Sequence, residues 1–247
     1  MAKYEHDDVV PNHQSTLSKK EQVATMFDNI APKYDFMNRF LSAGIDIGWR
    51  KKAIAQLADI KPNKVLDVAT GTADVAIMMQ KLLQPQSIIG IDISEGMLEV
   101  GRQKINAKGL QQSIQLYNGD SAAIAYADNN FDAVTLSFGV RNFEHLEKGL
   151  SEILRVLRPG GKLVVLEFSQ PKNSIVKSFY NLYMKVVSPN MAKLFSKNKQ
   201  AYEYLDASIK KFPEGKEFTK ILDKVGFKNS INKPLSLGLC SIYCGTK

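Results

Sequence analysis

Three acidic side chains follow successive apolar segments in the first half of the chain. Asp67 precedes the loop of "VLDVATGTADVA" (65–76), Asp92 follows "SIIGI", and Asp120 follows "SIQLYNG". Loops that bind the phosphates of a dinucleotide usually carry two or three glycines, whereas this loop has Gly71 alone. A carboxylate beside the loop would also repel a phosphate. The pattern therefore indicates a cationic nucleoside that carries no phosphate.

S-adenosylmethionine is such a ligand, because it has an ammonium and a sulfonium group and no phosphate. We expect Asp67 to accept hydrogen bonds around it. Asp92 lies about 20 residues beyond the glycine turn, which suits the ribose hydroxyls, and Asp120 with Ser121 would hold the adenine. An aspartate at such a position can instead be a helix cap, but Ser94 is an equally good cap for the helix after Asp92.

Arg141 and Asn142 end the segment "AVTLSFGVRN" (133–142), which is otherwise apolar or small. Two polar side chains at the end of a buried strand are placed to meet a substrate. The alternative is an ion pair between Arg141 and Glu144 or Glu147 on the following helix. Both interpretations stay open at this point.

The elements that would position these residues are short apolar strands alternating with amphipathic helices. This alternation predicts a doubly wound, parallel α/β sheet. A hairpin at the end of the chain would complete a seven-stranded, Rossmann-like sheet of the class I methyltransferase type. The predicted strands are 64–69, 87–93, 113–118, 131–138, 161–168, 226–233 and 237–245, and the helices are 73–83, 95–108, 144–157 and 214–225.

We expect one domain with two helical additions. Residues 1–20 are polar without a clear period and predict a flexible leader, and 21–247 form the domain. Within it, 21–60 would be an N-terminal helical segment on the substrate side. The stretch 170–213 is too long for a simple crossover and predicts an inserted helical cap.

The net charge of +8 is concentrated in part of the chain, because residues 172–220 hold ten lysines and no arginine. An anionic membrane surface, nucleic acid or plain solvation could each explain this stretch. Since arginine and aromatic residues do not alternate there, we expect no nucleic-acid partner. His145 is the only histidine beyond the leader, so neither a histidine-rich metal site nor a serine–histidine triad is expected.

Two features bear on the compartment. Cys240 and Cys244 would lie about 13 Å apart on one strand, too far for a disulfide. The chain has neither a run of about 18 apolar residues nor a secretory signal. We therefore expect a cytoplasmic protein.

Four blocks of sequence resemble the C-methyltransferases of menaquinone and ubiquinone biosynthesis. They are "YDFMNRFLSAGIDIGWR" (34–50), "SFGVRN" (137–142), "RVLRPGGKLVVLEFS" (155–169) and "AYEYLDASIKKFP" (201–213). The resemblance runs from Val23 to the end of the chain. It implies methyl transfer from S-adenosylmethionine to a ring carbon of a polyprenylated quinol, demethylmenaquinol or the corresponding benzoquinol. A homodimer is compatible with the resemblance, and the prenyl tail of such a substrate implies transient contact with the anionic inner face of the membrane.

The resemblance implies cofactor contacts, which it places on Thr72, Asp92, Asp120, Ser121 and Ser137. Ala73 stands where many relatives have glycine, which bears on the fine geometry of the loop. Tyr243 stands where relatives often have histidine, so a histidine base does not carry over.

For the chemistry, a quinol carbon becomes nucleophilic as the neighbouring hydroxyl loses its proton. Arg141 could stabilise the phenolate and Asn142 could orient the ring oxygen. Tyr34, Asp35, Tyr243 and a water molecule are all open as the proton acceptor. A related enzyme acting on another small molecule or on tRNA, and a protein that binds the cofactor without catalysis, are the alternatives.

Overall fold

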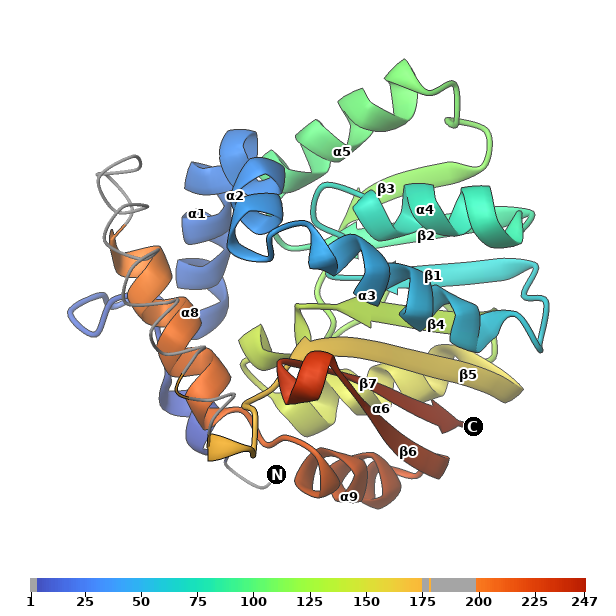
Figure 1. The fold of residues 1–247 in the computed structure, drawn as a ribbon. Coiled ribbons are helices and arrows are strands. Elements are labelled where there is room, and N and C mark those ends of the chain that lie inside the picture. The colour runs from blue at the N-terminus through green and yellow to red at the C-terminus, as the bar shows by residue number, and fades with distance from the viewer. Residues whose placement is uncertain (1–3, 175–177, 179–198) are drawn as a thin grey trace.

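The protein is built around one twisted sheet, seen in a computed structural model that describes residues 4–174, 178 and 199–247 (Figure 1). Seven strands lie in the order β3-β2-β1-β4-β5-β7-β6. Their bounds are β1 Lys64–Val68, β2 Ser87–Asp92, β3 Ile114–Asn118, β4 Phe131–Ser137, β5 Leu157–Phe168, β6 Lys228–Leu235 and β7 Cys240–Thr246. The predicted seven-stranded sheet is confirmed.

The strand directions are also as predicted. β1 pairs in parallel with β2 and β4, and the parallel order continues to β3 on one side and β5 on the other. β7 runs antiparallel between β5 and β6. The chain order reverses between β1 and β4, and in such sheets the ligand crevice lies outside the carboxyl ends of the strands at this reversal.

Helices bury both faces of the sheet, which explains why its strands read as continuous apolar runs. Val65 and Ala133 belong to the core cluster on the side of α3 (Ile45–Ile54), α4 (Asp74–Leu83) and α5 (Glu95–Ala107). Leu66 and Val134, each one residue further along, belong to the cluster of α6 (Leu146–Val156) and α9 (Lys216–Val225). Each fully buried side chain of this size stabilises the fold by roughly 1.5–3 kcal/mol.

Three further helices lie beyond the carboxyl ends of the parallel strands, at the end of the sheet away from the C-terminus (Figure 1). They are α1 (Lys19–Ile30), α2 (Tyr34–Leu41) and α8 (Lys199–Lys211). α1 begins with a capping box, in which Ser18 Oγ accepts a hydrogen bond from Glu21 N while Glu21 Oε2 accepts one from Ser18 N. Since the predicted crevice lies outside the same strand ends, these three helices cover it.

Only part of the predicted helical cap can be compared with the structure. α8 lies within it, whereas residues 175–177 and 179–198 lie outside the described residues. The same holds for much of the lysine-rich stretch. In the part of the chain that is described, no helix is long and apolar enough to cross a membrane.

The N-terminal stretch, which the sequence predicts as a flexible leader, contains a short helix that contacts distant parts of the chain. Glu5–Asp8 form a short 3-10 helix, and the side chain of His6 is fully buried, with its ring 5.9 Å from that of Phe212. Lys19 Nζ donates to the carbonyl oxygen of His6 at 2.6 Å. These contacts join single side chains to distant elements, so they leave no periodic pattern in the sequence.

β5 begins four residues before the predicted strand, because the Arg-Pro-Gly-Gly turn belongs to it. The register with β4 shifts between Phe131 and Ala133, which accommodates this turn. Gly160 has a φ of +78°, and a side chain at Gly161 would come within 2.8 Å of the carbonyl oxygen of Arg158. Both glycines are therefore required by the backbone path.

Candidate active site

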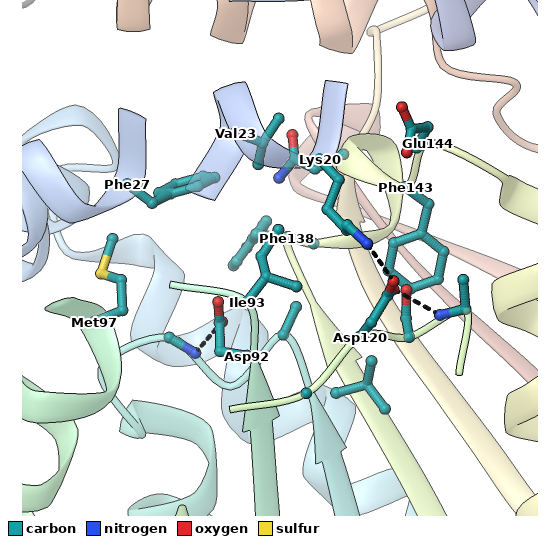
Figure 2. Close-up of a pocket in the computed structure, with 18 of the residues that line it drawn as sticks. Lys20, Val23, Phe27, Asp92, Ile93, Met97, Asp120, Phe138, Phe143 and Glu144 are labelled. Carbon is teal, nitrogen blue, oxygen red and sulfur yellow. Dashed lines mark hydrogen bonds and ion pairs between the residues drawn. The ribbon is translucent and has the colours of Figure 1, made fainter. Parts of the chain in front are cut away.

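A cavity of about 260 Å³ opens where β1, β2 and β4 end, beneath α1 (Figure 2). Lys20, Val23 and Phe27 of α1 lie across it from Asp92 and Asp120. Seven of the predicted site residues line this cavity: Tyr34, Gly71, Asp92, Asp120, Ser121, Ser137 and Asn142. The carboxyl ends of the parallel strands thus bring together side chains that are far apart in sequence.

Asp92, at the end of β2, binds the neighbouring loop and also faces the cavity. Its Oδ2 accepts from the backbone N–H of Gly71 at 2.8 Å, and its Oδ1 accepts from that of Ser94 at 2.9 Å. Burial raises the pKa of this carboxyl and outweighs the opposing effect of its hydrogen bonds from the backbone. Ser94 is the N-cap of α5, as the sequence predicts, so Asp92 does not serve as the cap.

The loop after β1 owes its shape to left-handed backbone conformations. Gly71 has a φ of +55°, and a side chain built there would meet no atom within 4 Å. Ala69 and Ala73 also have positive φ, of 52° and 63°. An alanine in this conformation costs roughly 1–2 kcal/mol, so the loop tolerates Ala73 at a modest cost.

Asp120 is paired with a cation from α1. Its Oδ2 lies 2.9 Å from Lys20 Nζ, and its Oδ1 accepts from the N–H of Ala122 at 2.8 Å (Figure 2). Burial alone would raise the pKa of this carboxyl, but the hydrogen bonds from Ala122 and Lys20 reverse the effect and hold it below its usual value. Asp120 is therefore ionised at neutral pH.

Asp67 does not reach the cavity, which corrects the expectation that it surrounds the nucleoside. It is buried, and its carboxylate accepts hydrogen bonds from the hydroxyls of Thr70 at 2.7 Å and Thr135 at 2.5 Å. Burial raises its pKa to about 6 against the opposing effect of both hydroxyls. Asp67 thus stabilises the loop through its hydrogen bond with Thr70.

Thr72 and Asp35 form a hydrogen bond with each other and do not line the cavity. Thr72 Oγ1 donates to Asp35 Oδ1 at 2.6 Å, and Lys104 Nζ lies 2.8 Å from Asp35 Oδ2. The structure therefore does not place the Thr72 side chain at a cofactor, or Asp35 where it could take a proton from a substrate.

The other two candidate proton acceptors are in different places. Tyr34 lines the cavity, with its ring 5.9 Å from that of Phe27. Tyr243 is fully buried in the middle of β7, where its hydroxyl accepts from Gly215 N at 2.8 Å and burial raises its pKa to about 12. The structure thus leaves Tyr243 without access to a substrate, which corrects that expectation.

Arg141 and Asn142, although adjacent, face different surroundings. Arg141 Nη1 lies 2.7 Å from Glu167 Oε1 and donates to the carbonyl oxygen of Phe138 at 2.6 Å, and both charged side chains are buried. Its partner is therefore neither Glu144 nor Glu147. Asn142 lines the cavity, and Arg141 does not. Arg141 therefore holds the turn from which Asn142 reaches the cavity.

Sequence reasoning missed much of the cavity wall. The apolar part comes from Val23, Phe27, Met97, Phe138 and Phe143, and the polar part includes Lys20, Glu144, His145 and Lys148. In the sequence, Val23 and Phe27 carry no signal beyond that of apolar positions at helical spacing. The same spacing that packs a helix on a sheet also places aromatic side chains over the end of the sheet.

The residues present fit S-adenosylmethionine. Asp92 and Asp120 offer carboxylate oxygens to hydroxyl and amino groups, and Gly71 leaves the loop open to close approach. Phe27 and Met97 supply an apolar wall. Lys20, the lysine that α1 contributes to the cavity wall, is already paired with Asp120.

Comparison with known proteins agrees with this geometry. Residues 15–247 match the sequence model of the ubiE/COQ5 methyltransferase family. The chain belongs to this family. The methyltransferase is 48% identical over 229 residues to demethylmenaquinone methyltransferase of Bacteroides fragilis, covering 93% of this chain and 94% of that protein. It is 41% identical over 230 residues to the ubiquinone/menaquinone biosynthesis C-methyltransferase of Geobacter sulfurreducens, covering 93% and 90%.

Solved structures show the same fold at low sequence identity. A SAM-dependent methyltransferase of Thermotoga maritima superposes with a TM-score of 0.61 at 19% identity, covering 91% of this chain and 99% of that one. Phosphoethanolamine N-methyltransferase 2 of Haemonchus contortus, in complex with S-adenosyl-L-methionine, has a TM-score of 0.55 at 15% identity, covering 75% and 48%. The methyltransferase therefore has the class I SAM-dependent methyltransferase fold.

Proposed function

We propose that this methyltransferase uses S-adenosylmethionine to methylate a ring carbon of a polyprenylated quinol, converting demethylmenaquinol to menaquinol in menaquinone biosynthesis. The observation that carries the proposal is the one cavity that Asp92, Asp120 and Asn142 share. Membership of the family, and the 48% identity to a relative named demethylmenaquinone methyltransferase, support the choice of substrate.

The cofactor half of the cavity would be held by Gly71, Asp92, Asp120 and Ser121. When bound, S-adenosylmethionine supplies an electrophilic methyl group: a carbon–carbon bond to the ring forms as the carbon–sulfur bond breaks, the electron pair of that bond stays on sulfur, and the ring carbon then loses its proton. Asp120 could accept from the adenine amino group while it stays paired with Lys20, because each carboxylate oxygen can accept more than one hydrogen bond.

The substrate half would be formed around Asn142. Asn142 lines the cavity, and its amide would bind the ring oxygen on which negative charge grows, while Phe138 and Phe143, which line the same cavity, would exclude water. Arg141 holds the turn through the carbonyl oxygen of Phe138, so it acts as a positioning residue. Of the protein side chains considered as proton acceptors, Tyr34 is the one that lines the cavity.

A benzoquinol of the ubiquinone pathway is the second candidate substrate. The relative from Geobacter sulfurreducens is named for both pathways, which favours this alternative over other small molecules or tRNA. The naphthoquinol carries a second ring fused to the reacting one, which the benzoquinol lacks.

The assay that tests the proposal offers the purified protein three methyl acceptors in separate reactions. These are a short-chain demethylmenaquinol, the corresponding demethylated benzoquinol and unmodified tRNA, each with S-adenosylmethionine carrying a labelled methyl group. We expect label on the naphthoquinol, at a rate at least about tenfold above the other two, as for a site that discriminates by about 1.4 kcal/mol. Preferential labelling of the benzoquinol or of tRNA would contradict the proposal.

We also propose that the enzyme meets its substrate at an anionic membrane surface, because a prenyl tail resides in lipid. The ten lysines of residues 172–220 support such a contact. In a liposome flotation experiment, we expect more protein to float with vesicles that contain anionic lipid than with neutral vesicles. Equal recovery of the protein with anionic and with neutral vesicles would contradict an electrostatic contact.

A further inference from the structure

Tyr204 of α8 is bound to the residue on which the substrate half of the site depends. Its hydroxyl donates to Asn142 Oδ1 at 3.0 Å, and its side chain is 4% exposed. α8 belongs to the C-terminal part of the chain, yet it packs against the 3-10 turn Val140–Asn142 that follows β4. A tyrosine 62 residues away in sequence is therefore bound to Asn142, a residue of the cavity wall.

The chemistry of this bond determines which end of the amide faces the cavity. An asparagine side chain has an oxygen that accepts and an NH₂ group with two donors. Burial raises the pKa of the Tyr204 phenol, and the nearby charges of Arg141 and Glu167 oppose each other. The phenol thus stays protonated at neutral pH and donates to Asn142 Oδ1, which leaves the NH₂ group available to the cavity.

The hydrogen bonds of the Arg141–Glu167 pair go to the backbone of the turn and not to the side chain of Asn142. Arg141 Nη1 is used by Glu167 Oε1 and by the carbonyl oxygen of Phe138. Glu167 Oε1 also accepts from the backbone N–H of Phe168 at 2.9 Å. The pair fixes the backbone of the turn, whereas Tyr204 fixes the side chain of Asn142.

We propose that Tyr204 is a positioning residue, which holds Asn142 so that its Nδ2 donates a hydrogen bond to the anionic oxygen of the quinol. This inference rests on the proposed function. A fixed donor at this point favours a phenolate over a group that itself carries hydrogen-bond donors, such as an amine. Tyr204 would thus help to select an oxygen-activated ring as the methyl acceptor.

The first test is Tyr204→Phe, which removes the hydroxyl and keeps the packing. Loss of a preorganised donor of this kind lowers kcat by roughly 10²–10³-fold. In Tyr204→Phe, Asn142 is still present but is no longer held by the tyrosine hydroxyl. We therefore expect a smaller decrease in kcat, of about tenfold to a hundredfold. The Kd of S-adenosylmethionine, measured by calorimetry, should stay within about twofold. Tyr126→Phe, which changes a half-buried tyrosine packed on Phe131, is the matched control.

The second test asks whether Tyr204 acts through Asn142. If it does, adding Tyr204→Phe to Asn142→Ala should lower kcat by no more than about twofold beyond Asn142→Ala alone, because coupled residues are not additive. This comparison holds even if Tyr204→Phe also lowers Tm. Losses that multiply in the double variant, or a Tyr204→Phe enzyme with the kcat of the wild type, would overturn the inference.

The wild-type reaction separates this result from the proposed function. All variants are compared on whichever acceptor the wild type methylates. If that acceptor is not demethylmenaquinol, the proposed substrate fails, while the ratio of Tyr204→Phe to wild type still tests the role of Tyr204.

Discussion

Asp92 is the residue on which the cofactor half of the site depends. Its carboxylate connects the end of β2 to the loop after β1, through the N–H groups of Gly71 and Ser94, and it also faces the cavity. An ionised carboxylate can accept from both N–H groups and still accept from hydroxyl groups of a ligand. An amide of the same shape cannot do so, because one of its two ends is a donor.

We therefore expect Asp92→Asn to weaken the binding of S-adenosylmethionine by roughly tenfold to a hundredfold, the range for a hydrogen bond to a charged group. The Kd measured by calorimetry checks this. Asp223→Asn, an exposed aspartate on α9, should bind the cofactor like the wild type. An unchanged Kd in Asp92→Asn would show that Asp92 serves the loop alone.

Strand periodicity explains why Asp67 and Tyr243 were placed wrongly from the sequence. Asp67 is still within β1, paired with Gly90 and Thr135, so its side chain is committed to one face of the sheet. Tyr243 is paired with Val165 in the middle of β7. A residue in the interior of a strand points to a face, whereas the last residue of a strand, such as Asp92, or one that follows a strand, such as Asp120, can reach the crevice.

At the scale of elements, α1 covers the cavity and is held at both ends. Near its C-terminus, Asp28 Oδ1 accepts from Ser94 Oγ at 2.6 Å and from Gly96 N at 2.9 Å. At its N-terminus, Lys20 pairs with Asp120, and the backbone N–H of Lys19 donates to Glu144 Oε1 at 3.0 Å. Since α1 supplies Val23 and Phe27 to the cavity, its position affects the binding of the cofactor.

The short 3-10 helix Glu5–Asp8 braces the N-terminal end of α1 and contains a buried histidine. Within the described residues, neither ring nitrogen of His6 has a hydrogen-bond partner, although Nε2 lies 3.4 Å from Asp7 Oδ1. Burial, and then the charge of Lys19, lower the pKa of His6 to about 3. Burial also lowers the pKa of Lys19 to about 8, so Lys19 stays charged below pH 7.

We expect this segment to loosen as the pH falls. The folded segment favours neutral His6, so its stability is fully present above the unfolded pKa of about 6.5 and is lost as the pH falls from there toward 3. At pH 5 the loss is about 2 kcal/mol. Hydrogen exchange of residues 4–9 should therefore be faster at pH 5 than at pH 7.5, after correction for the intrinsic rate.

His6→Phe, which keeps a ring against Phe212, should abolish this difference in protection. His13→Phe, at an exposed histidine, should retain it. Equal protection of residues 4–9 at the two pH values in the wild type would contradict the assignment to His6.

At the scale of the whole molecule, the sheet could be predicted because both of its faces are buried. Apolar runs such as "SIIGID" and "FDAVTLS" became β2 and β4 within one residue of the predicted bounds. The side chains at or beyond the ends of those strands, such as Asp92 and Asn142, were brought to one cavity because parallel strands end at the same edge.

The rest depends on contacts between elements that are far apart in sequence. The partner of Arg141 lies on β5, 26 residues away, and the partner of Lys20 lies 100 residues away. The burial of His6 depends on Phe212, near the other end of the chain. No local pattern reports such pairs, so the three-dimensional structure was needed to find them.

The central claim is that the cavity beneath α1 methylates demethylmenaquinol, and quinone analysis in cells tests it most directly. A bacterial strain that lacks its own quinol C-methyltransferase would carry either the wild-type protein or Asp92→Asn, at equal expression, and its quinones would be measured by mass spectrometry. We predict that the wild type restores menaquinone while Asp92→Asn leaves demethylmenaquinone to accumulate. Accumulation of demethylmenaquinone with both proteins, or its full conversion with both, would contradict the account.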